Sequence, residues 1–253
     1  MISARPFRKL PALIAAALLM LTSAAIAGDH LLPEDPALSD ENDFDGILYG
    51  VFKDLYTPDY PARMIAVQSF QREFAVALHV KDGRYSIVLL DPPTMLWGYQ
   101  VLADDIRQRD QDLAAGRDAR ADVKEIADLE VGMPSPDWRT VKPARCERPI
   151  DAALGAQLVE DWRAMLLQTR FAQPEPVASE SVFVDGDILH FSTWGGGMAG
   201  QITTPSNDGG DKTNLLIAIG FAMRDYCKTG DAKQRATIVQ AAADLAARLK
   251  QDG

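Results

Sequence analysis

The sequence has few residues that could bind a metal or a nucleic acid. Its 253 residues include only three histidines, His30, His79 and His190, which show no ligand spacing. It has no long basic run, and its net charge at pH 7 is −10, which argues against nucleic-acid binding. We therefore predict no metal, no cofactor and no nucleic-acid partner.

Motifs for nucleophilic catalysis are also missing. The chain has no Gly-x-Ser-x-Gly elbow. Ser192 lies two residues after His190 and near Asp187. On one strand, however, the side chains of His190 and Ser192 would be roughly 6.5–7 Å apart. Proton transfer needs about 3 Å, so we interpret the trio as ordinary strand polarity. Paired carboxylates can be distant in sequence, which leaves a hydrolase open as an alternative.

Apolar runs long enough to span a membrane, about twenty residues, are absent too. The N-terminal apolar run covers only 10–21 and lies between a cationic start and a small-residue end. This order is typical of a secretory signal peptide with an Ala-x-Ala cleavage site. We predict cleavage after Ala27 and export to the periplasm or the extracellular space, with no stable membrane anchor afterwards. A retained anchor is the alternative. The flanking residues are Arg5, Arg8 and Lys9 before the run and Ala25-Ile26-Ala27 after it.

Cleavage would make the chain more acidic. It removes three basic residues and no acidic ones, so the net charge changes from −10 to −13. Such a charge keeps a protein soluble and also attracts a cationic partner. In an oxidising compartment, Cys146 and Cys227 are a candidate disulfide. Two buried free thiols are the alternative.

Turn and strand signals predict two β-hairpins, each of which turns at an Asp-Gly pair. The first hairpin pairs residues 74–80 with 84–90 around Asp82-Gly83, a link typical of a type I′ turn. The second pairs 181–184 with 188–192. Further strands are predicted at 199–204 and 123–131.

Apolar residues at helical spacing predict four helices. Hairpins and helices that arrive in blocks indicate an α+β fold, with a mainly antiparallel sheet, flanking helices and two C-terminal helices. We predict one domain over 28–253, with a subdivision near the proline-rich residues 132–149 as an alternative. Residues 29–45 are expected to be a flexible lead-in, and 104–122 a surface helix or a mobile excursion. The four helices are expected at 44–56, 150–170, 214–227 and after Asp231.

A glycine-rich segment, 195–200, matches the Gly-x-Gly-x-x-Gly pattern. The dinucleotide motif needs a strand, a turn and a helix, whereas residues 201–205 resemble a strand or loop. We therefore predict a glycine turn without a cofactor. Glycines allow a close backbone approach, so this loop is still the best candidate for contacting a partner. Its residues, called the Trp194 loop below, are Trp194, Gly195, Gly196 and Gly197.

Two acidic segments resemble cation-binding loops. The first matches half of an EF-hand loop, but Phe52 occupies the twelfth position, where a glutamate is needed. We interpret its acids as caps of the helix that begins near Phe44, and residues 207–211 as a turn followed by a helix cap. The matching residues of the first segment are Glu41, Asp43, Asp45 and Gly46.

These observations predict an exported, soluble protein that is more readily a binding protein than an enzyme. The leading hypothesis is a non-catalytic protein-binding module of the inhibitor or immunity type, with an acidic surface for a basic protein partner. Trp138 and Trp194, expected in loops, are weak support for such a surface. The alternatives are a cell-envelope hydrolase with dispersed carboxylates and a structural envelope component.

Overall fold

The structure is a computed structural model that describes residues 29–33, 43–117, 135, 137–170, 186–194, 198–204 and 211–251. The predicted signal peptide, the predicted strand at 123–131 and the first strand of the second predicted hairpin lie outside these ranges. Within them, no helix is both long enough and apolar enough to cross a bilayer.

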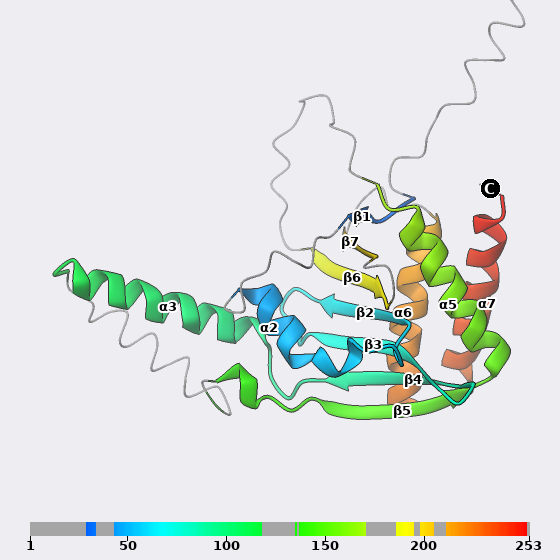
Figure 1. Cartoon of the computed structure of the whole chain (residues 1–253), viewed down its shortest axis with the longest axis horizontal. Helices are drawn as coiled ribbons and strands as arrows, with labels where there is room; N and C mark the ends of the chain where they lie inside the picture. The colour runs from blue at the N-terminus through cyan, green and yellow to red at the C-terminus, as the bar shows by residue number, and fades with distance from the viewer. Residues whose placement is uncertain are drawn as a thin grey trace, which may run out of the picture.

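The described residues form a seven-stranded antiparallel sheet with helices packed against it (Figure 1). The strand order is β1-β7-β6-β2-β3-β4-β5. This confirms the predicted α+β class. In chain order, the elements are β1 (Leu32–Pro33), α2 (Phe44–Val51), the 3-10 helix η2 (Lys53–Leu55), β2 (Ala62–Val67), β3 (Phe74–Lys81), β4 (Arg84–Asp91), α3 (Trp97–Ala114), the 3-10 helix η3 (Trp138–Thr140), β5 (Ala144–Ile150), α5 (Ala152–Leu167), β6 (Asp187–Thr193), β7 (Ala199–Thr204), α6 (Asp211–Thr229) and α7 (Ala232–Leu249).

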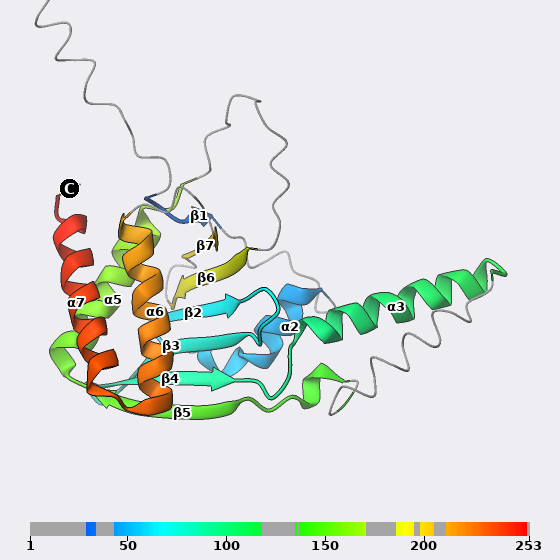
Figure 2. The ribbon, with the colours of Figure 1, turned by 180° about the vertical axis from the view of Figure 1, so that it is seen from behind.

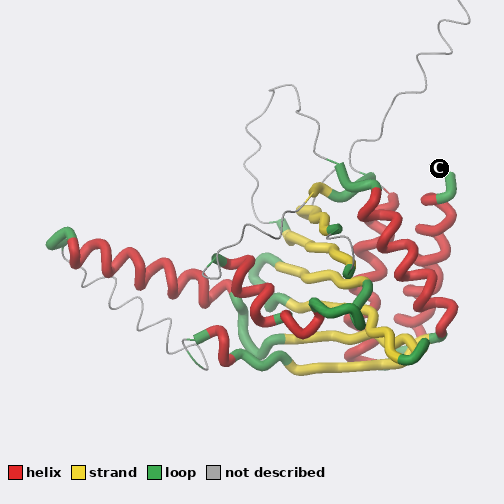
Figure 3. Tube along the Cα trace, in the orientation of Figure 1, coloured by secondary structure: helices red, strands yellow, loops and turns green. Residues whose placement is uncertain are grey.

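The middle of the sheet is buried on both faces. Successive side chains of a strand point to opposite faces, so Phe74, Val76 and Leu78 of β3 join the core with α5, α6 and α7. Ala75 and Ala77 of the same strand join a second core with α2. Figures 1 and 2 show the two groups of helices from opposite sides. Helix α3 extends well beyond the sheet (Figure 3).

The β3–β4 hairpin turns at Asp82 and Gly83. Both residues have positive φ, 52° and 72°, as a type I′ turn requires. The turn pairs Lys81 with Arg84, and the same register places His79 opposite Ser86. The described part of the second predicted hairpin, β6, pairs with β2 on one side and β7 on the other.

Strand β5 (Ala144–Ile150) overlaps the end of the proline-rich segment 132–149, where the sequence predicts no strand. Hydrogen-bonded and non-hydrogen-bonded pairs alternate along an antiparallel ladder. The pair that closes the β3–β4 hairpin is Lys81 and Arg84. Counting along the ladders from this pair, the backbone groups of Cys146 and Arg148 point toward β4, whereas the backbone of Pro149 points away from it. At an outward position of an edge strand the backbone N–H makes no ladder hydrogen bond, so a proline there loses none. Pro149 is therefore tolerated.

The start of the described chain is folded, which corrects the expected flexible lead-in for residues 29–33. Leu32 and Pro33 pair with β7, and Leu31 is fully buried. The Asp29 carboxylate accepts a hydrogen bond from the backbone N–H of Lys212 at 2.6 Å, near the start of α6. A carboxylate at a helix N-terminus is favourable, so this segment ties down the start of α6.

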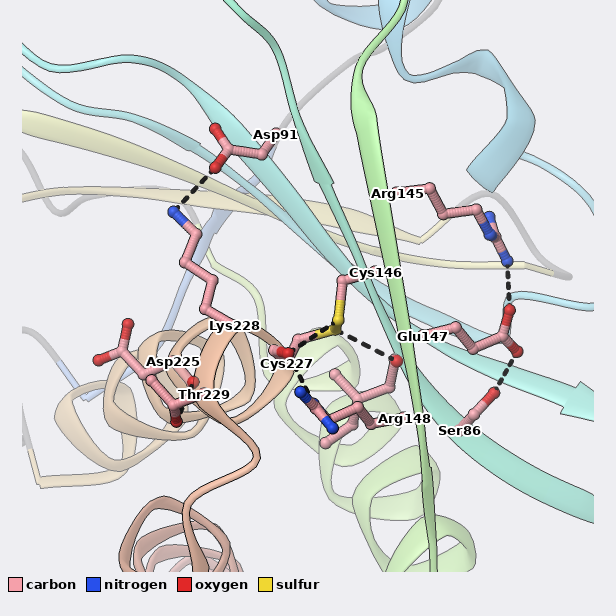
Figure 4. Close-up of a disulfide and its surroundings, with 11 residues drawn as sticks. Ser86, Asp91, Arg145, Cys146, Glu147, Arg148, Asp225, Cys227, Lys228 and Thr229 are labelled. Atoms are coloured by element: carbon pink, nitrogen blue, oxygen red, sulfur yellow. Dashed lines mark hydrogen bonds and ion pairs between the residues drawn. A yellow bond between two sulfur atoms is a disulfide. The ribbon is translucent and has the colours of Figure 1, made fainter.

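A disulfide joins Cys146 of β5 to Cys227 of α6, as predicted. The two Cα atoms are 6.0 Å apart. Beside the bridge, Arg148 Nε donates to the Cys227 carbonyl oxygen at 2.7 Å (Figure 4). The edge strand is therefore fixed to the helix layer by a covalent bond and by a charge-assisted hydrogen bond.

Replacing both cysteines, Cys146→Ser with Cys227→Ser, is expected to lower the free energy of unfolding by about 4 kcal/mol. The disulfide closes a long loop and so restricts the unfolded chain. Urea denaturation measures the change, and a reductant should destabilise only the wild type. A double variant within about 1 kcal/mol of the wild type would contradict this account of the bridge.

Helix α5 buries an acidic side chain, Asp161, beside α7. Burial raises the pKa of Asp161 from its ordinary value near 3.8 to about 6, although Gln157 and the charge of Lys250 act in the opposite direction. Within the described residues, its Oδ2 atom has no hydrogen-bond partner. The ionised form of Asp161 is therefore unfavourable in the folded state.

Asp161→Asn is expected to stabilise the protein near pH 7 by about 1–3 kcal/mol. The folded state holds the Asp161 proton more tightly than the unfolded state, so wild-type stability falls as the pH rises from about 4 to 6. The variant should lose this fall, which urea titrations at several pH values measure. Parallel pH profiles for the two proteins would contradict the assignment.

Candidate functional site

The Trp194 loop is only partly described. Trp194 follows β6, and its side chain is 48% exposed. Gly195, Gly196 and Gly197 lie outside the described residues. At this predicted site, the described residues therefore provide one exposed ring, that of Trp194.

The structure places Asp187, His190 and Ser192 on β6. His190 and Ser192 are two residues apart on one strand and share a face. Asp187 begins the strand, and its carboxylate accepts hydrogen bonds from Ser69 N at 3.0 Å and Gln68 Nε2 at 3.2 Å. The carboxylate thus holds the β2–β3 connection, which is a structural role.

The first acidic segment starts a helix, as predicted, but without the expected side-chain cap. Asp43 occupies the N-cap position of α2 and makes no side-chain cap hydrogen bond, while Asp45 lies in the first turn. Asp151 likewise precedes α5 without a side-chain cap bond. In contrast, Asp231 caps α7 by accepting from Lys233 N at 2.9 Å. Glu41 and residues 207–210 lie outside the described ranges.

Metal-binding clusters are not found in the described ranges, where no three His, Cys, Asp or Glu side chains could hold an ion together. The tryptophans divide into packed and exposed ones. Trp162 is buried in the core, as its helical spacing predicts. Trp138 corrects the expectation of an exposed loop residue, because its ring packs so closely on Gly50 of α2 that a Cβ there would collide with it.

Three exposed apolar residues belong to segments at the end of the sheet where β2 ends and α3 begins (Figure 1). They are Phe70, Trp97 and Ile188, called the α3-end surface below. Phe70 lies in the β2–β3 connection, is 82% exposed and has a φ of 58°. A phenylalanine rarely adopts this left-handed conformation, and strain of this kind is concentrated at functional sites.

The β2–β3 connection, which carries Phe70, is bonded to the segments that carry Trp97 and Ile188. The buried Glu73 carboxylate accepts hydrogen bonds from Leu96 N at 2.7 Å and Trp97 N at 3.0 Å, at the start of α3. Burial raises the pKa of Glu73, against the effect of these N–H donors. At the other end of the connection, Ser69 is bonded to Asp187, the residue before Ile188. One short connection therefore anchors both α3 and β6.

Acidic residues lie beside the α3-end surface. The ring of Phe44, the first residue of α2, contacts the ring of Trp97 edge-on, with centroids 5.1 Å apart. Its neighbours Asp43 and Asp45 are exposed. Trp97 is itself 50% exposed, so an apolar contact surface and two exposed carboxylates are adjacent.

A second cluster lies on the α2-facing side of β3, β4 and β5. It consists of Tyr60, His79, Ser86, Arg145 and Glu147 and is called the Glu147 cluster below. Glu147 Oε1 is 2.6 Å from Ser86 Oγ and 2.7 Å from His79 Nδ1. Its other oxygen, Oε2, accepts from Arg145 Nη2 at 2.9 Å. Figure 4 shows Arg145 and Ser86 on the carboxylate of Glu147.

The carboxylate of Glu147 is ionised at neutral pH. Partial burial would raise its pKa, but the hydrogen bonds from Ser86, His79 and Arg145, with the charge of Arg145, lower it to about 2. Tyr60 completes the cluster. Its ring stacks on His79 with centroids 4.9 Å apart, and its hydroxyl accepts from Arg145 Nη2 at 3.0 Å.

A groove between α6 and α7 contains two acids, Asp211 and Asp244. Asp211 is paired with Arg248 at 2.6 Å, and Asp244 accepts from Gln240 Nε2 at 2.9 Å. The four side chains belong to two exposed helix surfaces. This arrangement is typical of solvated helix faces rather than of a catalytic cleft.

Comparison with known proteins finds no match among family models, curated proteins or solved structures. The candidate sites therefore depend on their own geometry.

The sequence reasoning missed both clusters, although a signal for one was present. The two-residue hairpin at Asp82-Gly83 fixes the register, and counting back from it places His79 opposite Ser86. Glu147 could not be added, because β5 is not predicted. The exposed, positive-φ Phe70 has no sequence signature, since the turn signals favour glycine and asparagine there.

Phe70→Gly is expected to raise the free energy of unfolding by about 0.5–1 kcal/mol. Glycine adopts positive φ without the steric penalty of a Cβ, which outweighs its larger unfolded-state entropy. The exposed ring contributes little to the core. Urea denaturation measures the gain. Phe70→Ala, which keeps the Cβ, is the control and should show no gain; equal stability of the two variants would contradict the strain argument.

Proposed function

We propose that this chain is an exported protein-binding module of the inhibitor or immunity type, which binds a basic protein through the α3-end surface. The observation that carries the proposal is the exposure of Phe70 in a strained conformation at the same end of the sheet as the exposed residues Trp97 and Ile188. Apolar side chains that gather on a surface are typical of interaction sites, and aromatic residues dominate binding energies.

The class of partner follows from charge. Asp43 and Asp45 lie beside Trp97 through the Phe44 contact. The nearest basic residue of the β2–β3 connection, Arg72, is paired with Asp91 and donates to the Pro92 carbonyl oxygen. With an overall charge of −10, or −13 after the predicted cleavage, the protein would attract a cationic surface over long range.

Export is supported by the predicted signal peptide together with the Cys146–Cys227 disulfide. Disulfides persist in oxidising compartments and are rare in the cytosol. The envelope hydrolase is the weaker alternative for the α6–α7 groove, because its two acids are held by Arg248 and Gln240.

The proposal is tested by affinity capture from an envelope fraction with the purified protein as bait. We expect a basic protein to be retained, with less retained as the salt concentration rises, because screening weakens the attraction. The double variant Phe70→Gly with Trp97→Ala should weaken binding by about tenfold or more, as expected for interface aromatics.

Val239→Ala is the matched control, because Val239 is an exposed apolar residue of α7, on the other face of the sheet. It should bind as the wild type does. Capture of no basic protein, or equal loss in the control, would refute the proposed surface and partner.

A further inference from the structure

We propose that His79 is a general base that activates water for the hydrolysis of an acyl ester. Glu147 is its positioning residue, and Arg145 donates to the ester carbonyl oxygen. The inference depends on the Glu147 cluster alone and is independent of the α3-end surface.

The orientation of His79 suits a base. Its Nδ1 atom is 2.7 Å from Glu147 Oε1, and an ionised carboxylate can only accept a hydrogen bond. The imidazole proton therefore lies on Nδ1, which leaves the lone pair on Nε2. Within the described residues, Nε2 has no hydrogen-bond partner. The side chain is 17% exposed, so part of the imidazole is open to water.

Glu147 holds the imidazole in this tautomer and stabilises the imidazolium that forms when Nε2 takes a proton. This is the role of the carboxylate in Ser-His-Asp enzymes. Here, Arg145 and Ser86 bond the same carboxylate, so its position is fixed from three sides.

Arg145 supplies positive charge beside the base. Its Nη2 atom is engaged by Glu147 and Tyr60, while Nε and Nη1 have no partner among the described residues. The side chain is 38% exposed. A guanidinium N–H near a carbonyl oxygen stabilises the negative charge that develops there during attack.

Water, rather than Ser86, is the nucleophile. The Ser86 hydroxyl donates to Glu147 Oε1 and not to His79, and a carboxylate with a pKa of about 2 is too weak a base to take its proton. The cluster has one base and one cation. This fits an ester, whose alkoxide leaves more readily than the amine of an amide.

The reaction consumes one water molecule. His79 Nε2 takes a proton from water as the oxygen bonds to the carbonyl carbon, and the carbonyl electrons move onto the oxygen that faces Arg145. When this intermediate collapses, the bond to the alkoxide oxygen breaks. The imidazolium returns the proton to the alkoxide, which leaves an acid, an alcohol and the unchanged protein.

The test is the hydrolysis of p-nitrophenyl acetate by the purified protein. We expect His79→Gln to lower the rate by about tenfold or more, since general-base catalysis typically contributes 10²–10⁴-fold. The chain has only three histidines, so His30→Gln and His190→Gln are matched controls that should keep the wild-type rate. An unchanged rate in His79→Gln, or an equal loss in a control, overturns the proposal.

The variant Glu147→Gln tests whether Glu147 positions His79 for catalysis or only stabilises the fold. It should lower kcat with little change in KM, and the low-field NMR resonance of the His79 Nδ1–H should disappear. If His79→Gln does not fold, Glu147→Gln decides the matter: an unchanged kcat overturns the proposal. Loss of hydrolysis with intact capture of a basic protein, or the reverse, shows which of the two proposals has failed.

Discussion

The bond between Cys146 and Cys227 is the constraint on which the edge of the sheet depends. Among the described strands, β5 has a neighbour on one side only, and it contains a proline. The disulfide and the Arg148 hydrogen bond to the Cys227 carbonyl oxygen fix it to α6. Because neighbouring residues of a strand face opposite sides, fixing Cys146 on the helix side also sets the place of Glu147 on the other.

The candidate sites lie at the margins because the middle of the sheet is covered. Its two faces are filled by the helix layer and by α2. The α3-end surface lies where β2 ends and α3 begins. The Glu147 cluster lies past the α2 contact, toward the β3–β4 turn and the β5 edge. The two sites thus depend on different parts of one framework, the first on the β2–β3 connection and the second on β5.

The parts of the fold that follow local rules could be predicted from the sequence. The Asp82-Gly83 turn fixes its hairpin, the apolar spacing predicts α5, and Asp231 marks the start of α7. Strand β5 could not be predicted, because proline disfavours strands unless its position faces outward. Whether Pro149 faces outward depends on the register of β5 with β4, which only the tertiary structure shows. The candidate base His79 was visible in the sequence, but its carboxylate partner was not.

The outward turn of Pro149 also affects how copies of this protein meet one another. An exposed edge strand can recruit a strand from a second molecule and so begin aggregation. On β5, the outward backbone positions are Arg145, Glu147 and Pro149, of which the first two carry charge and the third has no N–H. At the opposite edge, β1 has only two residues. Among the described strands, neither edge can readily template a further strand, which keeps a sheet of seven strands from growing into a polymer.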